Sequence, residues 1–141
     1  MNESGIFSLT ALTIVFGLVV ALVASTVALA TWQTGQFATN TVALAAAADG
    51  SRAIMPSSLP GGRPTLDTAM ATRLAEVSAA RNGTALGLTM RAFAASTYVG
   101  GQTDTTTGYS FGRPGVGVQL QTTQGPFSFT AAADAELSWN P

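Results

Sequence analysis

The sequence predicts an α+β protein: a long N-terminal transmembrane helix continues into an Ala-rich helix, and a small domain of one short helix and three to four antiparallel β-strands follows. Three observations lead to this class. No charged residue occurs between Glu3 and Asp49. Apolar residues then recur at helical spacing after residue 65, and from Thr84 onward they alternate with polar ones. A helix with one apolar stripe and a sheet with one apolar face bury each other in such a domain.

The first element is the apolar stretch at residues 6–32, preceded by a leader or N-terminal tail at residues 1–5. Residues 11–30 are apolar except for Thr13, Ser25 and Thr26. A helix that crosses a lipid bilayer needs about 20 consecutive apolar residues, so this stretch predicts one membrane span in contact with lipid. Trp32, at its end, is placed as an interfacial anchor.

Two other interpretations of this stretch stay open. The first is a buried core helix, which rarely remains uncharged over such a length. The second is a removable signal peptide, for which Ala28-Leu29-Ala30 offers a small-x-small cleavage site, so that a mature chain begins near Thr31. The leader has no Lys or Arg, and the apolar run exceeds the roughly 7 to 15 residues of a signal core.

One face of the span is predicted to pack against other helices. Small or weakly polar residues recur there at intervals of three and four, which places them on the same side of a helix. Small residues let membrane helices approach closely, so we expect self-association or contact with other membrane helices. The same residue types are common in any membrane helix, which is the alternative interpretation. The predicted packing residues are Thr10, Thr13, Gly17, Ala21, Ser25 and Ala28.

The helix is predicted to continue through residues 33–49, because alanine dominates the end of this segment and is the best helix former. Gly35 is expected to soften the helix, and Gly50 to end it with a left-handed cap. Residues 50–64, rich in Pro, Gly and Ser, form a linker loop before the domain at residues 65–141.

A short amphipathic helix is predicted at residues 66–81. Thr65 is placed as its N-cap, with Asp67 in the first turn, and Asn82-Gly83 closes it. Its apolar stripe is expected to face the core. That stripe consists of Leu66, Met70, Leu74 and Val77.

Strands are predicted where apolar and polar residues begin to alternate along the chain. The first covers residues 85–99, the second includes the alternation at residues 116–121, and the last runs from Phe127 to Trp139, after a turn at Gln124-Gly125-Pro126. Asp134 and Glu136 on the last strand are expected to face water. Residues 102–108, polar and rich in Thr, are expected to form a disordered turn.

Composition excludes several functions. The chain has no Cys and no His, which removes disulfides, thiol nucleophiles, Cys/His metal sites and the usual general base. Its few carboxylates form no catalytic spacing, so we expect no enzyme activity, no catalytic residue, no metal, no cofactor and no small-molecule substrate. A net charge of -1, with no Lys, gives no electrostatic support for nucleic-acid binding.

The order of these elements resembles the TadE-like pseudopilins of tight-adherence systems and, more loosely, the type IV pilins. The residues that carry the resemblance are Glu3-Ser4-Gly5 before the span, the Ala-rich residues 40–48 after it, and Ala79-Ala80-Arg81-Asn82-Gly83 before the strands. The resemblance implies a structural subunit of a pilus or fimbrium, with a processing site between Gly5 and Ile6. That family usually carries Glu as the fifth residue after the cut, where this chain has Thr10.

The sequence therefore favours a single-pass protein of the cell membrane, assembling through its N-terminal helix and displaying a β-rich head, in the manner of a surface filament. The alternative is a non-catalytic accessory subunit of a larger membrane complex. We expect the C-terminal domain outside the cytoplasm, from the resemblance and from its Thr-rich, Lys-free composition. Arg52 and Arg63 after the span favour the opposite topology under the positive-inside rule.

Overall fold

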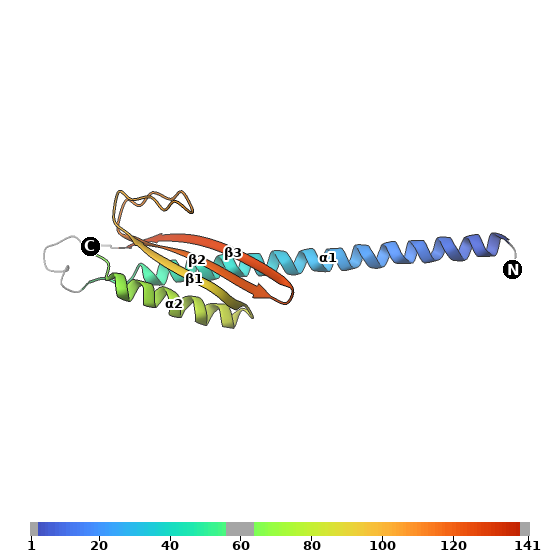
Figure 1. Ribbon diagram of the computed structural model, residues 1–141, viewed down its shortest axis with the longest axis horizontal. Coiled ribbons are helices and arrows are strands. Elements are labelled where there is room, and N and C mark those ends of the chain that lie inside the picture. Colours follow the sequence, from blue (N-terminus) through green and yellow to red (C-terminus); the bar gives the residue numbers. More distant parts are fainter. Residues whose placement is uncertain (1–2, 56–63, 139–141) are drawn as a thin grey trace. The chain divides into compact units, whose positions relative to one another are not determined.

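The computed structural model describes the backbone of residues 3–55 and 64–138, and side chains from residue 8 onward within those ranges. Its described elements are α1 (Glu3–Gly50), α2 (Thr68–Ala85), β1 (Thr89–Tyr98), β2 (Gly115–Gln124) and β3 (Phe127–Glu136) (Figure 1). The three strands form one antiparallel sheet in the order β1-β2-β3. The predicted α+β class is confirmed. The chain divides into two compact units, residues 1–34 and residues 35–141.

The second unit, called the head below, has two layers. The last part of α1 and all of α2 cover one face of the sheet (Figure 1). On this inner face, Val118 of β2 pairs with Ala95 of β1 and with Ala133 of β3, and Leu120 pairs with Phe93 and Ala131. Alternate side chains of a strand point to the same face, so these rows form the sheet's half of the core.

The helical half of the core is built mostly from alanine. Ala46 and Ala47 of α1 and Ala71 and Ala75 of α2 are fully buried. A Cβ on Gly50 would lie 3.0 Å from the Ala71 carbonyl oxygen and 3.1 Å from the Ala75 Cβ. Gly50 is therefore needed for the close approach of the two helices. It is not among the glycines with positive φ, so the predicted left-handed cap is wrong.

Gly35 also has a packing role, whereas its predicted softening of α1 stays a prediction. The helix continues through this position without interruption. A Cβ on Gly35 would lie 2.2 Å from Cζ and 2.5 Å from Cε2 of Phe129, whose side chain is only 1% exposed. The absent side chain is thus what leaves room for the ring of Phe129 against the helix.

The N-terminal boundary of α2 differs from the prediction by two residues. Asp67, not Thr65, is the N-cap, and its Oδ1 accepts a hydrogen bond of 3.0 Å from the Met70 N–H. Thr65 is unsuited to this role because its carbonyl accepts from the Met55 N–H, and its neighbour Leu66 forms an antiparallel bridge with Ile54. The central part of the predicted linker, residues 56–63, lies outside the described residues.

The C-terminal boundary of α2 shows why the first strand starts later than predicted. The helix continues past Asn82-Gly83 to Ala85, and the Gly87 and Leu88 N–H groups bond back to the Thr84 and Gly83 carbonyls. With Gly87 at a φ of 69°, this is the Schellman arrangement. Residues 85–88, predicted as strand, therefore form the helix end, and Leu88 is buried in the core of the head.

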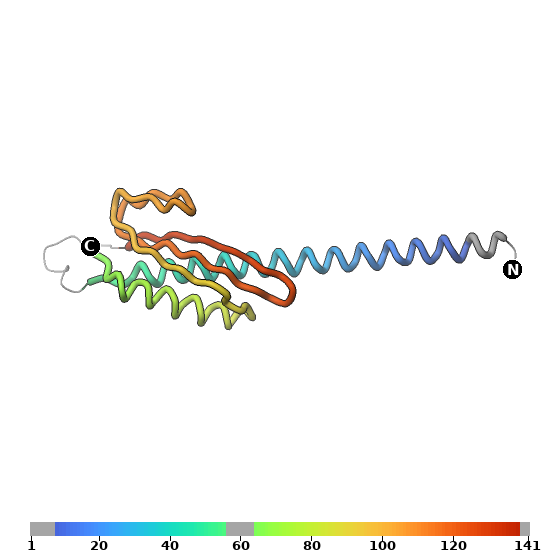
Figure 2. The backbone as a smooth tube through the Cα atoms, viewed as in Figure 1, coloured from blue at the N-terminus to red at the C-terminus, as the bar shows by residue number. Residues whose placement is uncertain are grey.

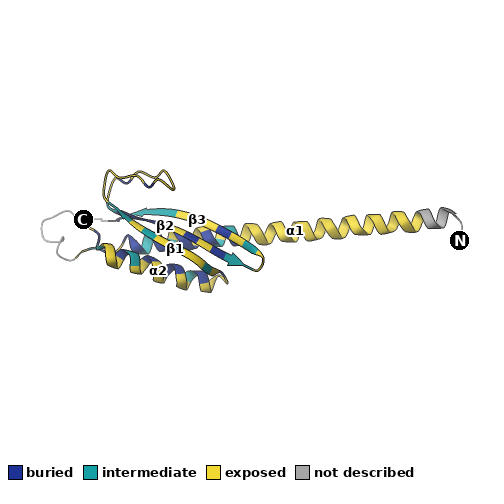
Figure 3. Cartoon of the chain, viewed as in Figure 1, coloured by how far each residue is buried: buried dark blue, intermediate teal, exposed yellow. Residues whose placement is uncertain are grey.

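The prediction for the buried face of α2 is also wrong. Met70, Leu74 and Val77 are 49%, 37% and 57% exposed, whereas Leu66, which precedes the helix, is buried. The face that meets the core carries Ala71, Ala75, Ser78, Ala79 and Gly83 (Figure 3). Small residues allow the helix to approach the sheet and α1 more closely than a stripe of large side chains would permit.

The last strand begins as predicted, at Phe127, after a two-residue turn in which Gly125 has a φ of 56°. Gln124 and Phe127 are register partners, which confirms the predicted hairpin. The strand ends at Glu136, whereas the prediction extended it to Trp139. Trp139 lies outside the described residues.

Candidate membrane-spanning segment and the strap of the head

The first unit is a helix that is exposed at every described position. From Ser8 to Thr34 no side chain is buried, and the same helix is coloured exposed throughout that range in Figure 3. Most large apolar side chains are more than half exposed, as in Leu12 (66%), Phe16 (69%) and Leu22 (68%). By length and composition this is the one candidate membrane span among the described residues, with a mean hydropathy of 2.6 in its most apolar window.

The predicted packing residues occupy one side of this helix. At about 100° per residue, Thr10, Gly17, Ala21 and Ala28 fall within about 40° of one another, and Thr13 and Ser25 flank them. Val19 and Val23 lie on the opposite side. We call Thr10, Thr13, Gly17, Ala21, Ser25 and Ala28 the small-residue face. No described residue of the chain covers it.

The hydroxyl groups of this segment are compatible with lipid. Thr13 Oγ1 donates to the Leu9 carbonyl at 2.9 Å, and Ser25 Oγ donates to the Ala21 carbonyl at 2.8 Å. Thr26 and Thr31 make the same bond to the carbonyl four residues earlier. Because these four hydroxyl protons have acceptors within the helix, their transfer to an apolar medium leaves none of the four donors unsatisfied.

The shape of the small-residue face is set by Gly17. A Cβ there would meet no atom within 4 Å, so the backbone itself is accessible at this turn. Trp32, the predicted interfacial anchor, is 44% exposed. Gly5 and Ile6, the candidate processing site, belong to the first turns of α1. The segment thus has three distinct parts: the small-residue face, the opposite side with its bulky apolar residues, and Trp32 near its end.

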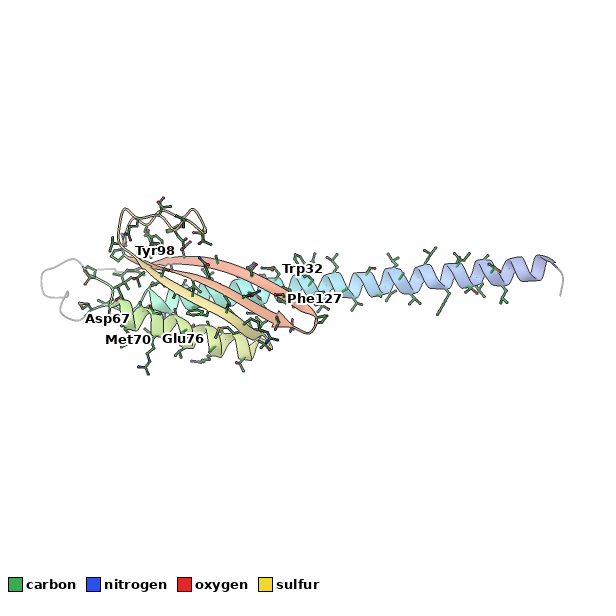
Figure 4. All side chains as sticks on the ribbon, in the orientation of Figure 1. Trp32, Asp67, Met70, Glu76, Tyr98 and Phe127 are labelled. Atoms are coloured by element: carbon green, nitrogen blue, oxygen red, sulfur yellow. The ribbon has the colours of Figure 1, made fainter. Side chains whose placement is uncertain are left out.

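Sequence reasoning missed a second feature, a strap formed by residues 99–114 between β1 and β2 (Figure 2). The expected disorder of residues 102–108 is wrong. Thr103 and Ser110 form an antiparallel bridge, and the Asp104 N–H donates to the Tyr109 carbonyl at 2.9 Å. Phe111, only 2% exposed, stacks on Tyr98 with ring centroids 4.6 Å apart. This aromatic contact anchors the strap (Tyr98 is labelled in Figure 4).

The strap covers the acidic end of β3. Thr107 Oγ1 donates to Asp134 Oδ2, and Glu136 Oε1 accepts from the Gly112 N–H at 2.6 Å. Asp134 and Glu136 do lie on the sheet face opposite the core, but they do not simply face water as predicted, because the strap packs over them. The available sequence signal was Gly117, which leaves space for the carboxylate of its strand partner Asp134 and for that of Asp104 in the strap.

Two carboxylates converge above that glycine. A Cβ on Gly117 would lie 2.6 Å from Asp104 Oδ2 and 2.7 Å from Asp134 Oδ1, and the latter atom is buried without a hydrogen-bond partner among the described residues. Burial, together with the Asp104 charge, raises the pKa of Asp134 despite the Thr107 bond. Burial also acts to raise the pKa of Asp104, but donors from Thr106 and Tyr98 outweigh it, and the pKa is lowered.

Beside the strap lies an open groove of about 450 Å³ on the outer face of the sheet. Its lining residues are all uncharged, mostly alanine, threonine and glutamine with Phe93 and Leu120. Gln119 Nε2 donates to Thr106 Oγ1 of the strap at 2.5 Å. Among the described residues there is no group of three or more His, Cys, Asp or Glu side chains that could hold a metal ion.

Comparisons of the chain with protein-family models, with curated proteins and with solved structures found no match.

Proposed function

We propose that this chain is a structural single-span membrane protein of the pilin-like or pseudopilin kind. It assembles through the small-residue face of α1 and displays a β-rich head outside the cytoplasm. The observation that carries the proposal is the first unit itself: an uncharged apolar helix whose large side chains are exposed along its whole described length. Such a surface is stable only when lipid or other apolar helices cover it.

The element order supports a pilin-like role over a simple anchor. The helix that carries the small-residue face is continuous with the helix that forms part of the core of the head. Self-association in lipid relies on close van der Waals contact, for which Gly17 and Ala21 provide the least obstructed backbone. The resemblance to TadE-like pseudopilins points in the same direction.

Single-cysteine cross-linking tests the packing face directly, because the chain contains no native cysteine. We expect Gly17→Cys, Ala21→Cys and Ser25→Cys to give homodimers or ladders in membranes under oxidation. Val19→Cys and Val23→Cys, from the opposite side of the same helix, are the matched controls. Equal adducts from both sides would contradict assembly through the small-residue face.

Processing and topology need separate measurements. Intact mass of the purified chain reports whether the bond between Gly5 and Ile6 is cut, as the resemblance implies, or whether the chain begins near Thr31. For topology, a cysteine at exposed Gly101 is expected to react with a membrane-impermeant maleimide in intact cells. Labelling only after the cells are lysed would place the head on the cytoplasmic side.

A second candidate is a non-catalytic accessory subunit of a larger membrane complex. Thr10 favours it, because the resembled family usually has Glu at that position. Purification in mild detergent distinguishes the two proposals. Recovery at a fixed ratio with unrelated subunits supports the accessory role, whereas a polymer of this chain alone supports the pilin-like role.

A further inference from the structure

The outer side of α2 is an apolar stripe that no described part of the chain covers. Met70, Leu74 and Val77 follow one another at intervals of four and three, so they lie along one side of the helix, and all are exposed. Figure 4 marks Met70 on α2 at the edge of the head. A groove of about 420 Å³, lined in part by Leu74, Val77 and Arg81, runs beside the stripe toward the end of α1.

The charges at the two ends of this stripe are opposite in sign. Asp67 stands at the N-terminal end, where Oδ1 caps the helix and Oδ2 forms no hydrogen bond with a described residue. Arg81 stands at the C-terminal end, is exposed, and forms no ion pair with any described residue. Arg73 and Glu76 lie farther round the helix from the stripe and are exposed as well.

We infer that the α2 stripe binds the α2 stripe of a second copy of this chain, with the two helices antiparallel about a two-fold axis near Leu74. In such an isologous contact, a residue n positions after Leu74 in one copy faces the residue n positions before Leu74 in the other copy. Arg81 is seven residues after Leu74 and Asp67 is seven before it. Each copy therefore places its Arg81 opposite the partner's Asp67, and the two-fold axis repeats the pair.

The remaining residues of the stripe fit the same axis. Met70 and Val77 are four before and three after Leu74, so they oppose each other to within one residue, or about 1.5 Å along the helix. A parallel pairing would instead set Asp67 beside Asp67 and Arg81 beside Arg81. Charge complementarity thus selects the antiparallel second copy as the occupant.

The contact is small, so its affinity depends on local concentration. An exposed ion pair contributes about 0.2–1 kcal/mol, and three apolar side chains per copy fall below the area of a standard protein interface. Chains that share a membrane or an assembly meet at a much higher effective concentration than free chains do. This head contact uses a different surface from the small-residue face of α1 and is tested separately from it.

Cross-linking of the full chain in detergent gives the first test. Leu74→Cys is expected to form a homodimeric disulfide, because the residue lies at the axis. Ala80→Cys is the matched control: it is exposed on the same helix but lies roughly 18 Å along the axis from its copy in the antiparallel pair. Equal yields at the two positions, or a Leu74→Cys adduct with a different protein, would overturn the inference.

Charge variants give a second test that preserves the helix. Asp67→Asn removes the charge but keeps a good N-cap, and Arg81→Gln removes its partner. Each is expected to weaken self-association by about two- to thirtyfold, since the axis duplicates the pair, and the double variant is expected to be no weaker than either single one. Additive losses, or no loss, would refute the pairing. Loss of Gly17→Cys cross-links alone would count against the proposed function and leave this contact standing.

Discussion

Enlarging Gly35 is the sharpest probe of how α1 is joined to the core of the head. Gly35→Ala places a methyl group 2.2 Å from Cζ of Phe129, well inside van der Waals contact, and the ring is only 1% exposed in a closely packed interior. Overpacking of this kind costs about 1–3 kcal/mol, while the change from Gly to Ala in a helix returns about 1 kcal/mol. Because the clash is severe, we expect a net loss of about 1–2 kcal/mol.

The assay is thermal unfolding of the full chain in detergent, followed by near-ultraviolet circular dichroism of the aromatic residues in the head. A loss of 1 kcal/mol corresponds to roughly 4–8 °C in a domain of this size. Gly17→Ala is the matched control: it is the same chemical change in the same helix, but the new methyl group meets nothing within 4 Å. We expect its head to melt at or above the original temperature.

Phe129→Leu supplies the coupling test. Alone, it destabilises the head by leaving a cavity next to Gly35. Combined with Gly35→Ala, it removes the ring atoms with which the methyl group clashes, so the double variant is expected to be more stable than the sum of the single losses predicts. Additive losses, or a Gly35→Ala variant as stable as Gly17→Ala, would refute close packing between α1 and Phe129.

Three further predictions concern the strap and the end of α2. Because the pKa of Asp134 is raised, its protonated form stabilises the head at low pH, and this contribution is lost as pH rises above the ordinary value of 3.8. The pKa of Asp104 is lowered, so its ionised form stabilises the head, and that contribution is lost only on further acidification. The free energy of unfolding of the head is therefore expected to fall as pH rises from mild acid toward neutrality. Asp134→Asn is expected to flatten that decline, and an unchanged slope in the variant would contradict the role of Asp134. Phe111→Ala is expected to cost about 3–5 kcal/mol and to speed amide exchange in residues 102–110; unchanged exchange would show that the aromatic anchor is dispensable. Gly87→Ala forces a side chain into positive φ and is expected to cost about 1 kcal/mol in urea unfolding, whereas Gly83→Ala, inside the helix, is expected to cost less.

The sequence was most informative where a pattern is repeated over many residues. The apolar run of α1 and the alternation from Phe127 onward each involve enough positions to determine the element type, and both elements were predicted with the correct class. The hairpin at Gly125-Pro126 could also be predicted, because a tight turn depends on a few neighbouring residues.

The sequence was misleading where the buried residues depend on how closely two elements approach each other. The amphipathic rule assigned Met70, Leu74 and Val77 to the core of the head, but the close approach of α2 to Gly50 and the sheet leaves room only for small residues there. The strap was missed for a related reason. Its order comes from Phe111 stacking on Tyr98 and from the hydrogen bond of Thr107 to Asp134, which join residues far apart in sequence.

The alanines of the head change how its tolerance to mutation is best measured. Seven of its buried apolar residues are already alanine, so truncation to alanine, the usual way of finding a core, leaves these positions untouched. Alanine also has no side-chain rotamers with which to absorb a larger neighbour. A scan that enlarges residues is therefore the informative one. It is expected to divide α2 into an intolerant face at Ala71, Ala75 and Ala79 and a permissive face at Met70, Leu74 and Val77.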